Sequence, residues 1–466
     1  MIMKALMIPL EYGCPAKIFA RWQSLPWSIL LESVPTEQAI SPQSQYSFIA
    51  IDPFLKFEFR NNQIYLNEVL QSEKDPLILL KNLIKNYPLS LTPNLPPFQG
   101  GLAGFFSYEF GAYLMNFNPL PVIEKNIPLI ALGFYDLVIA FDHLQKKCYL
   151  FSSGYSENAS CSIHAQNRAN WVLNKLNADS GNFNDIPQFS AQKIVSNFTQ
   201  ESYRSAIKKL IHYIKEGDIF EANLAQRFSS SLPKELTPYE LYLLLRLHNP
   251  KPFAAFLNFI TFQLVSSSPE RFLKLENGHV EARPIKGTIE RGKNIEEDLV
   301  LANTLLQCEK NRAENIMIVD LMRNDLSKVC EIDSVDVPQL CGLESFPTVH
   351  HLVSVITAKL KDKIDALDLL AASFPAGSIT GAPKIRAMEI ISELEPHPRG
   401  PYCGCIGYIG FDGGMDLSII IRTFVVQGTE LSFHAGGAIV LDSDPQKEYE
   451  ETLQKALALK KILTEL

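Results

Sequence analysis

Three apolar segments near the end of the chain are separated by tight-turn sequences, and this pattern restricts the fold more than any other feature. The segments are 403–411, 417–426 and 431–441, with turns at 412–414 and 427–429. Strands that follow one another through hairpin turns pair antiparallel. The sequence therefore predicts an α+β fold built on antiparallel sheet, and it argues against a doubly wound nucleotide-binding fold.

A helical period is clearest in the middle of the chain. Tyr203, Ile207, Leu210 and Ile214 recur every three or four residues, which places them on one helix face, and Gly217 follows as a stop. Further helices are expected over 165–176, 308–327, 383–394 and from 446 to the end, and strands over 47–51, 129–141, 254–272 and 279–285.

Changes in composition and hydrophobic periodicity along the sequence predict three regions. Residues 1–152 combine short strands with turns, which suggests a smaller N-terminal domain. Residues 153–195 are polar and rich in Asn and Ser, as in a connector. Residues 196–466 show the sharper periodicity expected of a larger domain, and no internal repeat is apparent.

The overall charge excludes two classes of partner. The 466 residues include 43 Lys and Arg and 51 Asp and Glu, a net charge of −8. Nucleic acid and anionic membranes both attract basic surfaces, so neither is expected as a partner. A small anionic substrate would need a local cationic site or a metal ion.

No segment is long and apolar enough to span a bilayer, and the N-terminus lacks a convincing signal peptide. The eight cysteines are scattered and form no Cys-x-x-Cys motif, as expected for free thiols in a reducing cytoplasm.

Two glycine-containing segments resemble phosphate loops only superficially. We expect 100–104 to form a structural turn, because no Lys-Ser/Thr pair follows it. Segment 377–384 opens a helix, whose free N–H groups favour an anion. Ligand contact and a plain helix cap are equally compatible with this second segment.

Several charged side chains have both a simple and a functional interpretation. Glu448, Glu451 and Lys455 lie within about 60° of one another on the terminal helix, as surface pairs often do. Glu314 lies among Lys and Arg, where a surface network is the ordinary expectation. Lys286 ends a strand before a glycine. It is either solvated or a nucleophile whose pKa nearby cations or burial would have to lower.

Taken together, these segments resemble the chorismate-utilising enzymes, which include anthranilate, aminodeoxychorismate, isochorismate and salicylate synthases. The matching segments keep the family's order and are 217–227, 268–271, 284–288, 312–325, 377–384, 421–423, 435–438 and 448–455, with weaker matches at 30–33, 46–48 and 100–109. The resemblance implies two antiparallel sheets packed face to face with helices outside, and an active site in a cleft of the larger domain.

The resemblance also implies a reaction. Aminodeoxychorismate synthases carry lysine where Lys286 stands, whereas anthranilate synthases carry alanine. Lys286 would attack C2 of chorismate as the C4 hydroxyl leaves, and ammonia would then enter at C4 and expel the lysine. Glu270 would be the general acid and base. The product would be 4-amino-4-deoxychorismate, a step toward p-aminobenzoate and folate.

Cofactor and binding residues follow from the same resemblance. Mg²⁺ would be held by Glu314, Glu448 and Glu451, whose carboxylate oxygens suit a hard cation. The pyruvyl carboxylate would meet Tyr402, Arg422, Lys455 and the backbone of Gly436 and Gly437. The ring pocket would be lined by Gly287, Thr288, His351 and Thr380.

No glutaminase nucleophile is visible in the chain, so ammonia is expected from a glutamine amidotransferase partner in a heterodimer. The resemblance also allows a tryptophan pocket framed by 31–33, which could be regulatory, structural or empty.

Three positions depart from the family pattern, namely Asn311, Ala438 and Cys405. An anthranilate synthase and a non-catalytic chorismate-binding subunit remain the alternatives.

Overall fold

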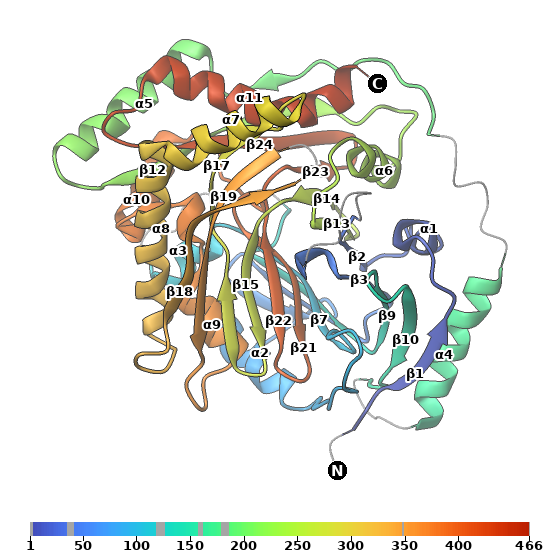
Figure 1. Ribbon diagram of the computed structural model, residues 1–466. Coiled ribbons are helices and arrows are strands. Elements are labelled where there is room, and N and C mark those ends of the chain that lie inside the picture. The colour runs from blue at the N-terminus through green and yellow to red at the C-terminus, as the bar shows by residue number, and fades with distance from the viewer. Residues whose placement is uncertain are drawn as a thin grey trace.

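Two large sheets, each of twelve strands, form the framework of the computed structural model, which describes residues 3–34, 42–117, 126–156, 162–178, 186–346 and 349–465. Neighbouring strands within each sheet pair antiparallel, as predicted. Figure 1 shows the two sheets with helices along their outer sides. The predicted α+β class is therefore confirmed.

The first sheet joins strands from both halves of the chain. Its order is β1 (Leu6–Leu10), β10 (Lys147–Ser152), β9 (Leu137–Asp142), β3 (Tyr46–Ala50), β2 (Ser28–Glu32), β13 (Phe253–Asn258), β14 (Gln263–Ser268), β23 (Thr423–Gln427), β24 (Glu430–Ile439), β12 (Glu221–Ser231) and β11 (Val195–Ser196), with β20 (Gly381–Ala382) beside β12.

The second sheet also joins strands from both halves of the chain. Its order is β17 (Ile285–Glu290), β19 (Val349–Lys359), β16 (His279–Ala282), β15 (Arg271–Glu276), β22 (Met415–Ile419), β21 (Cys405–Gly410), β7 (Gly101–Phe106), β8 (Ile130–Tyr135), β4 (Leu55–Arg60), β5 (Gln63–Leu66) and β6 (Val69–Leu70), with β18 (Asp336–Ser345) beside β19. The boundaries at residues 152 and 195 stay a prediction, but strands from either side of them share both sheets.

Both faces of the first sheet are buried. On β2, Ile29 belongs to a core cluster shared with Phe105 and Leu417 of the second sheet, whereas its neighbour Leu30 belongs to a cluster on the outer face. Successive strand residues point to opposite faces, so one strand contributes to both cores. The larger core therefore lies between the two sheets.

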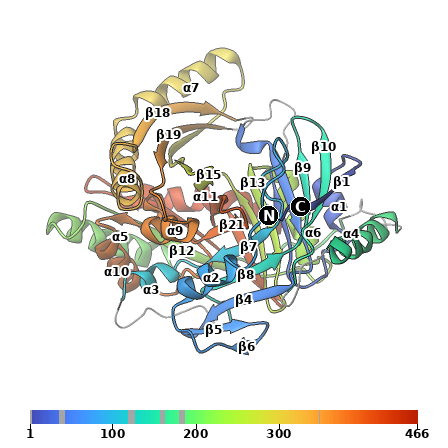
Figure 2. The same ribbon diagram turned by 90° about the horizontal axis from the view of Figure 1, so that it is seen from below.

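Helices cover the outer faces and the ends of the sheets (Figure 2). They are α1 (Pro15–Phe19), α2 (Pro76–Ile84), α3 (Phe110–Leu114), α4 (Ser162–Asn177), α5 (Gln200–Lys215), α6 (Pro238–His248), α7 (Ile295–Gln307), α8 (Glu309–Ser327), α9 (Ala366–Ser373), α10 (Lys384–Leu394) and α11 (Pro445–Thr464). The helices predicted at 165–176, 308–327, 383–394 and from 446 are confirmed as α4, α8, α10 and α11. No helix among the described residues is long and apolar enough to cross a membrane. The seven described cysteines are free thiols, and Cys161 lies outside the described residues.

Two segments predicted as single strands are each divided between the sheets. Segment 417–426 comprises β22 in the second sheet and β23 in the first, and the chain crosses between them at 420–422. Segment 129–141 comprises β8 and β9, which separate at Asp136. The prediction was wrong here because these runs are buried on both faces, which hides the break in the hydrophobic pattern.

The turn predicted at 100–104 was also wrong, because Gly101–Phe106 forms β7. A Cβ on Gly104, whose φ is +153°, would lie 2.0 Å from the carbonyl oxygen of Ala131 on β8. A Cβ on Gly101 would lie 2.3 Å from the carbonyl oxygen of Ile409 on β21. These glycines therefore allow close approach of three strand backbones.

A buried ion pair fixes the segment 377–384 against α8. The ammonium of Lys384 lies 2.6 Å from a carboxylate oxygen of Asp325 and donates to the carbonyl oxygen of Ser373 at 2.7 Å. Both charged side chains are buried. Lys384 therefore has a structural role, and the polar end of α8 is explained by the same pair.

We predict that Lys384→Met lowers the free energy of unfolding by about 3 kcal/mol, because Asp325 would remain buried with only the exposed Lys328 as partner. Arg323→Met is the matched control, since it breaks the exposed pair with Asp320 and should cost less than about 1 kcal/mol. Urea unfolding measures both changes. Equal small losses would contradict the structural role.

Candidate active site

Lys286 lies on an irregular part of β17. The register with β19 shifts between Ile285 and Thr288, and Gly287 between them has φ of +86°. Asn311 of α8 packs against Gly287 so closely that a Cβ there would lie 2.9 Å from its amide nitrogen. The bulge directs the buried Lys286 ammonium to Glu221 at 2.8 Å and to Glu314 at 3.9 Å.

The carboxylates around Lys286 determine its charge. Burial lowers its pKa, but Glu221 and Glu314 more than offset this and leave the pKa above its ordinary value. Burial acts in the direction expected from the sequence, and the effect of a nearby metal cation on this pKa stays a prediction. Glu221 was given no role from the sequence, although it lies in the matching segment 217–227 and is 1% exposed.

Glu270 lies where the chain crosses from β14 in the first sheet to β15 in the second. Its carboxylate accepts a hydrogen bond from the Ser378 hydroxyl at 2.8 Å and a longer one, 3.4 Å, from the N–H of Ile285. Burial raises its pKa to about 7, although these hydrogen bonds and Lys286 oppose the rise. A carboxyl group with this pKa can donate and accept a proton near neutral pH.

Thr288 and His351 meet across β17 and β19, as their shared assignment to the ring pocket requires. The Thr288 hydroxyl lies 2.8 Å from Nδ1 of His351. Burial, then the positive charges of Arg422, Lys251 and His350, lower the pKa of His351 to about 3. The imidazole is therefore neutral, and its role in the ring pocket stays a prediction.

Hydrogen bonds with backbone groups fix the position of Thr380. Its hydroxyl donates to the carbonyl oxygen of Ala376 at 3.0 Å, and its carbonyl oxygen accepts from the N–H of Asn223 at 2.7 Å. The segment fixed by Lys384 thus brings Ser378 to Glu270 and Thr380 to β12.

The acidic cluster joins α8 to α11, which lie at the side and across the top of Figure 1. Lys310 of α8 lies 2.9 Å from Glu448 and 3.9 Å from Glu314, and Lys455 lies 2.8 Å from Glu451. On Glu451, burial is outweighed by Lys455, so its pKa is lowered. Lysines thus neutralise all three carboxylates.

Gly437 provides the backbone surface beneath this cluster. A Cβ there would lie 3.5 Å from Glu451, 3.6 Å from Glu448 and 3.8 Å from the ammonium of Lys455. Lys455 also donates to the carbonyl oxygen of Gly436 at 3.0 Å. The sequence-based grouping of these residues is therefore present in the structure.

A divalent metal ion fits the chemistry of this cluster. One oxygen of Glu448 is buried without a hydrogen-bond partner, and carboxylate oxygens are the donors that Mg²⁺ prefers. Within the described ranges, no three His, Cys, Asp or Glu side chains already stand in metal-binding geometry. Glu314, Glu448 and Glu451 are therefore the residues that would hold Mg²⁺, and their role stays a prediction.

Arg422 lies at the second crossing between the sheets, with φ of +51°. The crossings at Glu270 and Arg422 are adjacent, since Ser266 pairs with Thr423 and the N–H of Ile419 donates to the Glu270 carbonyl oxygen at 3.0 Å. The Arg422 guanidinium makes no hydrogen bond or ion pair with any residue that the structure describes. Burial lowers its pKa, and Glu270 opposes the fall.

Tyr402 is positioned beside the same crossing. The N–H of Cys403 donates to the carbonyl oxygen of Ile420 at 2.8 Å, and the Tyr402 ring stacks on His434 with centroids 4.9 Å apart. Among the described residues, no hydrogen bond or cation–π contact joins Tyr402 to Arg422.

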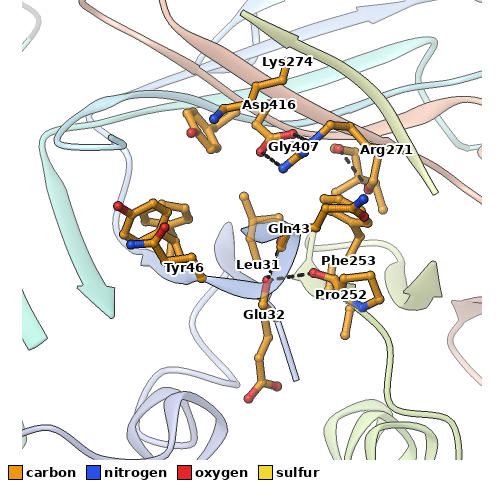
Figure 3. Close-up of a pocket in the computed structure, with 18 of the residues that line it drawn as sticks. Leu31, Glu32, Gln43, Tyr46, Pro252, Phe253, Arg271, Lys274, Gly407 and Asp416 are labelled. Atoms are coloured by element: carbon orange, nitrogen blue, oxygen red, sulfur yellow. Dashed lines mark hydrogen bonds and ion pairs between the residues drawn. The ribbon is translucent and has the colours of Figure 1, made fainter. Parts of the chain in front are cut away.

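A separate pocket lies between the two sheets near the N-terminal strands (Figure 3). Its lining includes Leu31, Ser33, Tyr46, Phe48 and the Arg271–Asp416 ion pair. The Glu32 carboxylate points away from the pocket, toward Tyr242 and Arg246 of α6. Ser33 donates to the carbonyl oxygen of Pro252 at 2.8 Å, so residues 31–33 do frame a cavity.

The sequence matches the model of the chorismate binding enzyme family over residues 28–461. The chain belongs to this family of enzymes. It is 39% identical to aminodeoxychorismate synthase component 1 of Escherichia coli K12, over 94% of this chain and 93% of that protein. It is 38% identical to anthranilate synthase component 1 of Bacillus pumilus, over 93% and 86% of the two chains.

Solved structures agree with this assignment. Anthranilate synthase component I from Streptococcus pneumoniae superimposes with a TM-score of 0.81 at 32% identity, covering 91% of this chain and 95% of that one. The menaquinone-specific isochorismate synthase MenF of Escherichia coli has the same fold, with a TM-score of 0.75 at 17% identity over 99% and 95% of the chains. The predicted family and sheet architecture are confirmed.

We predict that Glu221→Gln lowers the pKa of Lys286, because the nearest negative charge is lost while burial remains. Competitive acetylation of individual lysines over a pH series, read by peptide mass spectrometry, measures this value. Glu276→Gln, which removes a carboxylate from the exposed pair with Lys274, is the control and should leave Lys286 unchanged. An unchanged pKa in Glu221→Gln would show that Glu221 does not hold the proton on Lys286.

Proposed function

We propose that the protein aminates chorismate at C4 to give 4-amino-4-deoxychorismate, using ammonia from a glutamine amidotransferase partner. The observation that carries this proposal is the buried primary amine of Lys286, which lies between Glu221 and Glu314 and near Glu270. Only a member of the family with an amine at this position has a nucleophile there for a covalent adduct.

The first chemical step requires a neutral amine. Lys286 carries a proton in this arrangement, and Glu221 at 2.8 Å is the nearest acceptor for it. The amine nitrogen would then bond to C2 of chorismate as the two conjugated ring double bonds shift and the C4–oxygen bond breaks. Glu270, with a pKa of about 7, would donate a proton to the leaving hydroxyl, which departs as water.

The second step reverses the first with a different nucleophile. Ammonia would bond to C4, the two double bonds would shift back, and the C2–nitrogen bond to Lys286 would break. Glu270 would accept a proton from the entering ammonia, which returns it to its acid form for the next turnover.

The remaining residues would bind the substrate, which is a dianion. Mg²⁺ held by Glu314, Glu448 and Glu451 would supply positive charge to the ring carboxylate. Arg422 and Tyr402 would meet the pyruvyl carboxylate, with Lys455 and the backbone of Gly436 and Gly437 beside them. Thr288, His351, Thr380 and Gly287 would line the ring.

The proposal also includes a partner subunit and a second ligand. Relatives named component 1 support a second component, and the sequence shows no glutaminase nucleophile. The aromatic side chains of Tyr46, Phe48 and Phe253 in the N-terminal pocket suit a planar ligand, so tryptophan there stays a prediction. A cytoplasmic location also stays a prediction.

Anthranilate formation is the second candidate, because relatives of that name match at similar identity. The two functions give different products from chorismate, Mg²⁺ and ammonium. We expect 4-amino-4-deoxychorismate, identified by chromatography and mass spectrometry, and no fluorescent anthranilate. The isolated chain should not use glutamine until an amidotransferase subunit is added. Anthranilate as the main product would overturn the proposal.

We predict that Lys286→Arg binds chorismate within about threefold of wild type but forms product at least about a hundredfold more slowly. Arginine retains the charge beside Glu221, and its guanidinium stays protonated and cannot attack carbon. Without ammonia, wild type should gain the mass of a substrate adduct on the peptide containing Lys286, and the variant should not. Wild-type turnover by Lys286→Arg would exclude lysine as the nucleophile.

We predict that Glu314→Gln weakens Mg²⁺ binding by about tenfold or more, since a charged oxygen donor is lost from the cluster. Calorimetric titration with Mg²⁺ measures the effect without reference to turnover. Asp320→Asn, which changes an exposed carboxylate on the same helix, is the control. If both variants bind Mg²⁺ as wild type does, the metal assignment fails.

A further inference from the structure

Lys251 is a buried cation that the proposed mechanism does not use. It lies between α6 and β13 and is 7% exposed. Its ammonium makes no hydrogen bond or ion pair with any residue in the described part of the chain. Burial of an unpaired charge costs free energy, so such a group is retained only where it meets an anion or serves another purpose.

Hydrogen bonds hold the Lys251 segment against the active-site crossing. The hydroxyl of Ser267 donates to the carbonyl oxygen of Asn249, and the N–H of the same serine donates to the carbonyl oxygen of Arg422 at 3.2 Å. The carbonyl oxygen of Lys251 itself accepts from the N–H of Val34 at 3.3 Å. Lys251 and Arg422 are therefore fixed relative to each other through one residue of β14.

The electrostatic neighbours of Lys251 belong to the active site. Burial and then Arg422 lower its pKa to about 8, which leaves it mostly protonated at pH 7. Its charge also contributes to the low pKa of His351. Pro252 and Phe253 line the N-terminal pocket, whereas Lys251 does not. The positive charges of Lys251 and Arg422, neither of which has an ion-pair partner among the described residues, both favour the neutral form of His351.

Lys455 is less available to bind an anion than Lys251 and Arg422 are. Its ammonium already contacts Glu451 at 2.8 Å and the Gly436 carbonyl oxygen at 3.0 Å. An anion arriving beside Arg422 would satisfy Lys251 without breaking an existing ion pair, whereas Lys455 would have to leave or share Glu451.

We propose that Lys251 binds the pyruvyl carboxylate of chorismate together with Arg422. This inference rests on the proposed use of chorismate as substrate and adds a residue that sets its affinity. It assigns the two carboxylates of the substrate to different charges, the ring carboxylate to the acidic cluster and its metal, and the pyruvyl carboxylate to the Lys251–Arg422 pair.

Lys251→Met tests the charge while it keeps the length of the side chain. We expect the KM for chorismate to rise at least about tenfold, as for the loss of a hydrogen bond to a charged group, with kcat within about threefold. Lys251→Arg should keep KM within about threefold. Lys209→Met, at an exposed site on α5, is the control for loss of one positive charge from the protein.

Benzoate separates the two carboxylate sites, because it has a ring carboxylate and no pyruvyl group. Its inhibition constant in the presence of Mg²⁺ should be unchanged in Lys251→Met. Equal weakening of benzoate and chorismate, or an unchanged KM for chorismate, would overturn the assignment.

Stability gives a readout independent of substrate. Because Lys251 has no partner to lose, Lys251→Met should unfold in urea at the same or a higher concentration than wild type. A clear loss of stability would instead indicate a structural contact and would overturn the inference. If wild type forms anthranilate, the proposed product is wrong, but the effect of Lys251 on chorismate affinity is still measured.

Discussion

The candidate active site depends on two places where the chain passes from one sheet to the other. Glu270 lies between β14 and β15, and Arg422 lies between β22 and β23. Because β14 pairs with β23 and β15 pairs with β22, the two crossings are held side by side. A strand that leaves its sheet exposes its last side chains at the sheet boundary. A buried carboxyl group, Glu270, and a half-buried guanidinium, Arg422, are thereby brought to adjacent positions that a continuous strand would not provide.

The charged side chains at this boundary form two groups, which differ in whether the protein itself supplies the opposite charge. Around Lys286, the carboxylates of Glu221 and Glu314 hold the amine protonated. Around Arg422 and Lys251, no carboxylate among the described residues forms an ion pair. One side of the site is therefore balanced internally and the other is balanced only when an anion binds. In the proposed function, this asymmetry would let a protein of net charge −8 bind a dianionic substrate.

Much of the architecture was predictable from the sequence, because hairpin turns and helical periods are local signals. The crossings inside segments 417–426 and 129–141 were not predictable, since each of these apolar runs contains only one charged residue, Arg422 or Asp136, to indicate the break. Residues such as Lys286 and Glu270 were recognised through their resemblance to a family. The direction in which the pKa of Lys286 is shifted could not be recognised from the sequence, because Glu221 is 65 positions away in the chain. Lys251 belongs to no recognised motif, and only its burial without a partner distinguishes it.

The mixed order of the sheets has a consequence for synthesis on the ribosome. β7, at residues 101–106, lacks its neighbour β21 until residue 410 has been made. In the same way, β2 cannot pair with β13 until residue 258 has been made. Unpaired strand edges of this kind recruit other chains. The nascent N-terminal third is therefore exposed to misassociation for most of translation. Helix α11 carries Glu448, Glu451 and Lys455, so the acidic cluster between α8 and α11 cannot form until this helix has been made.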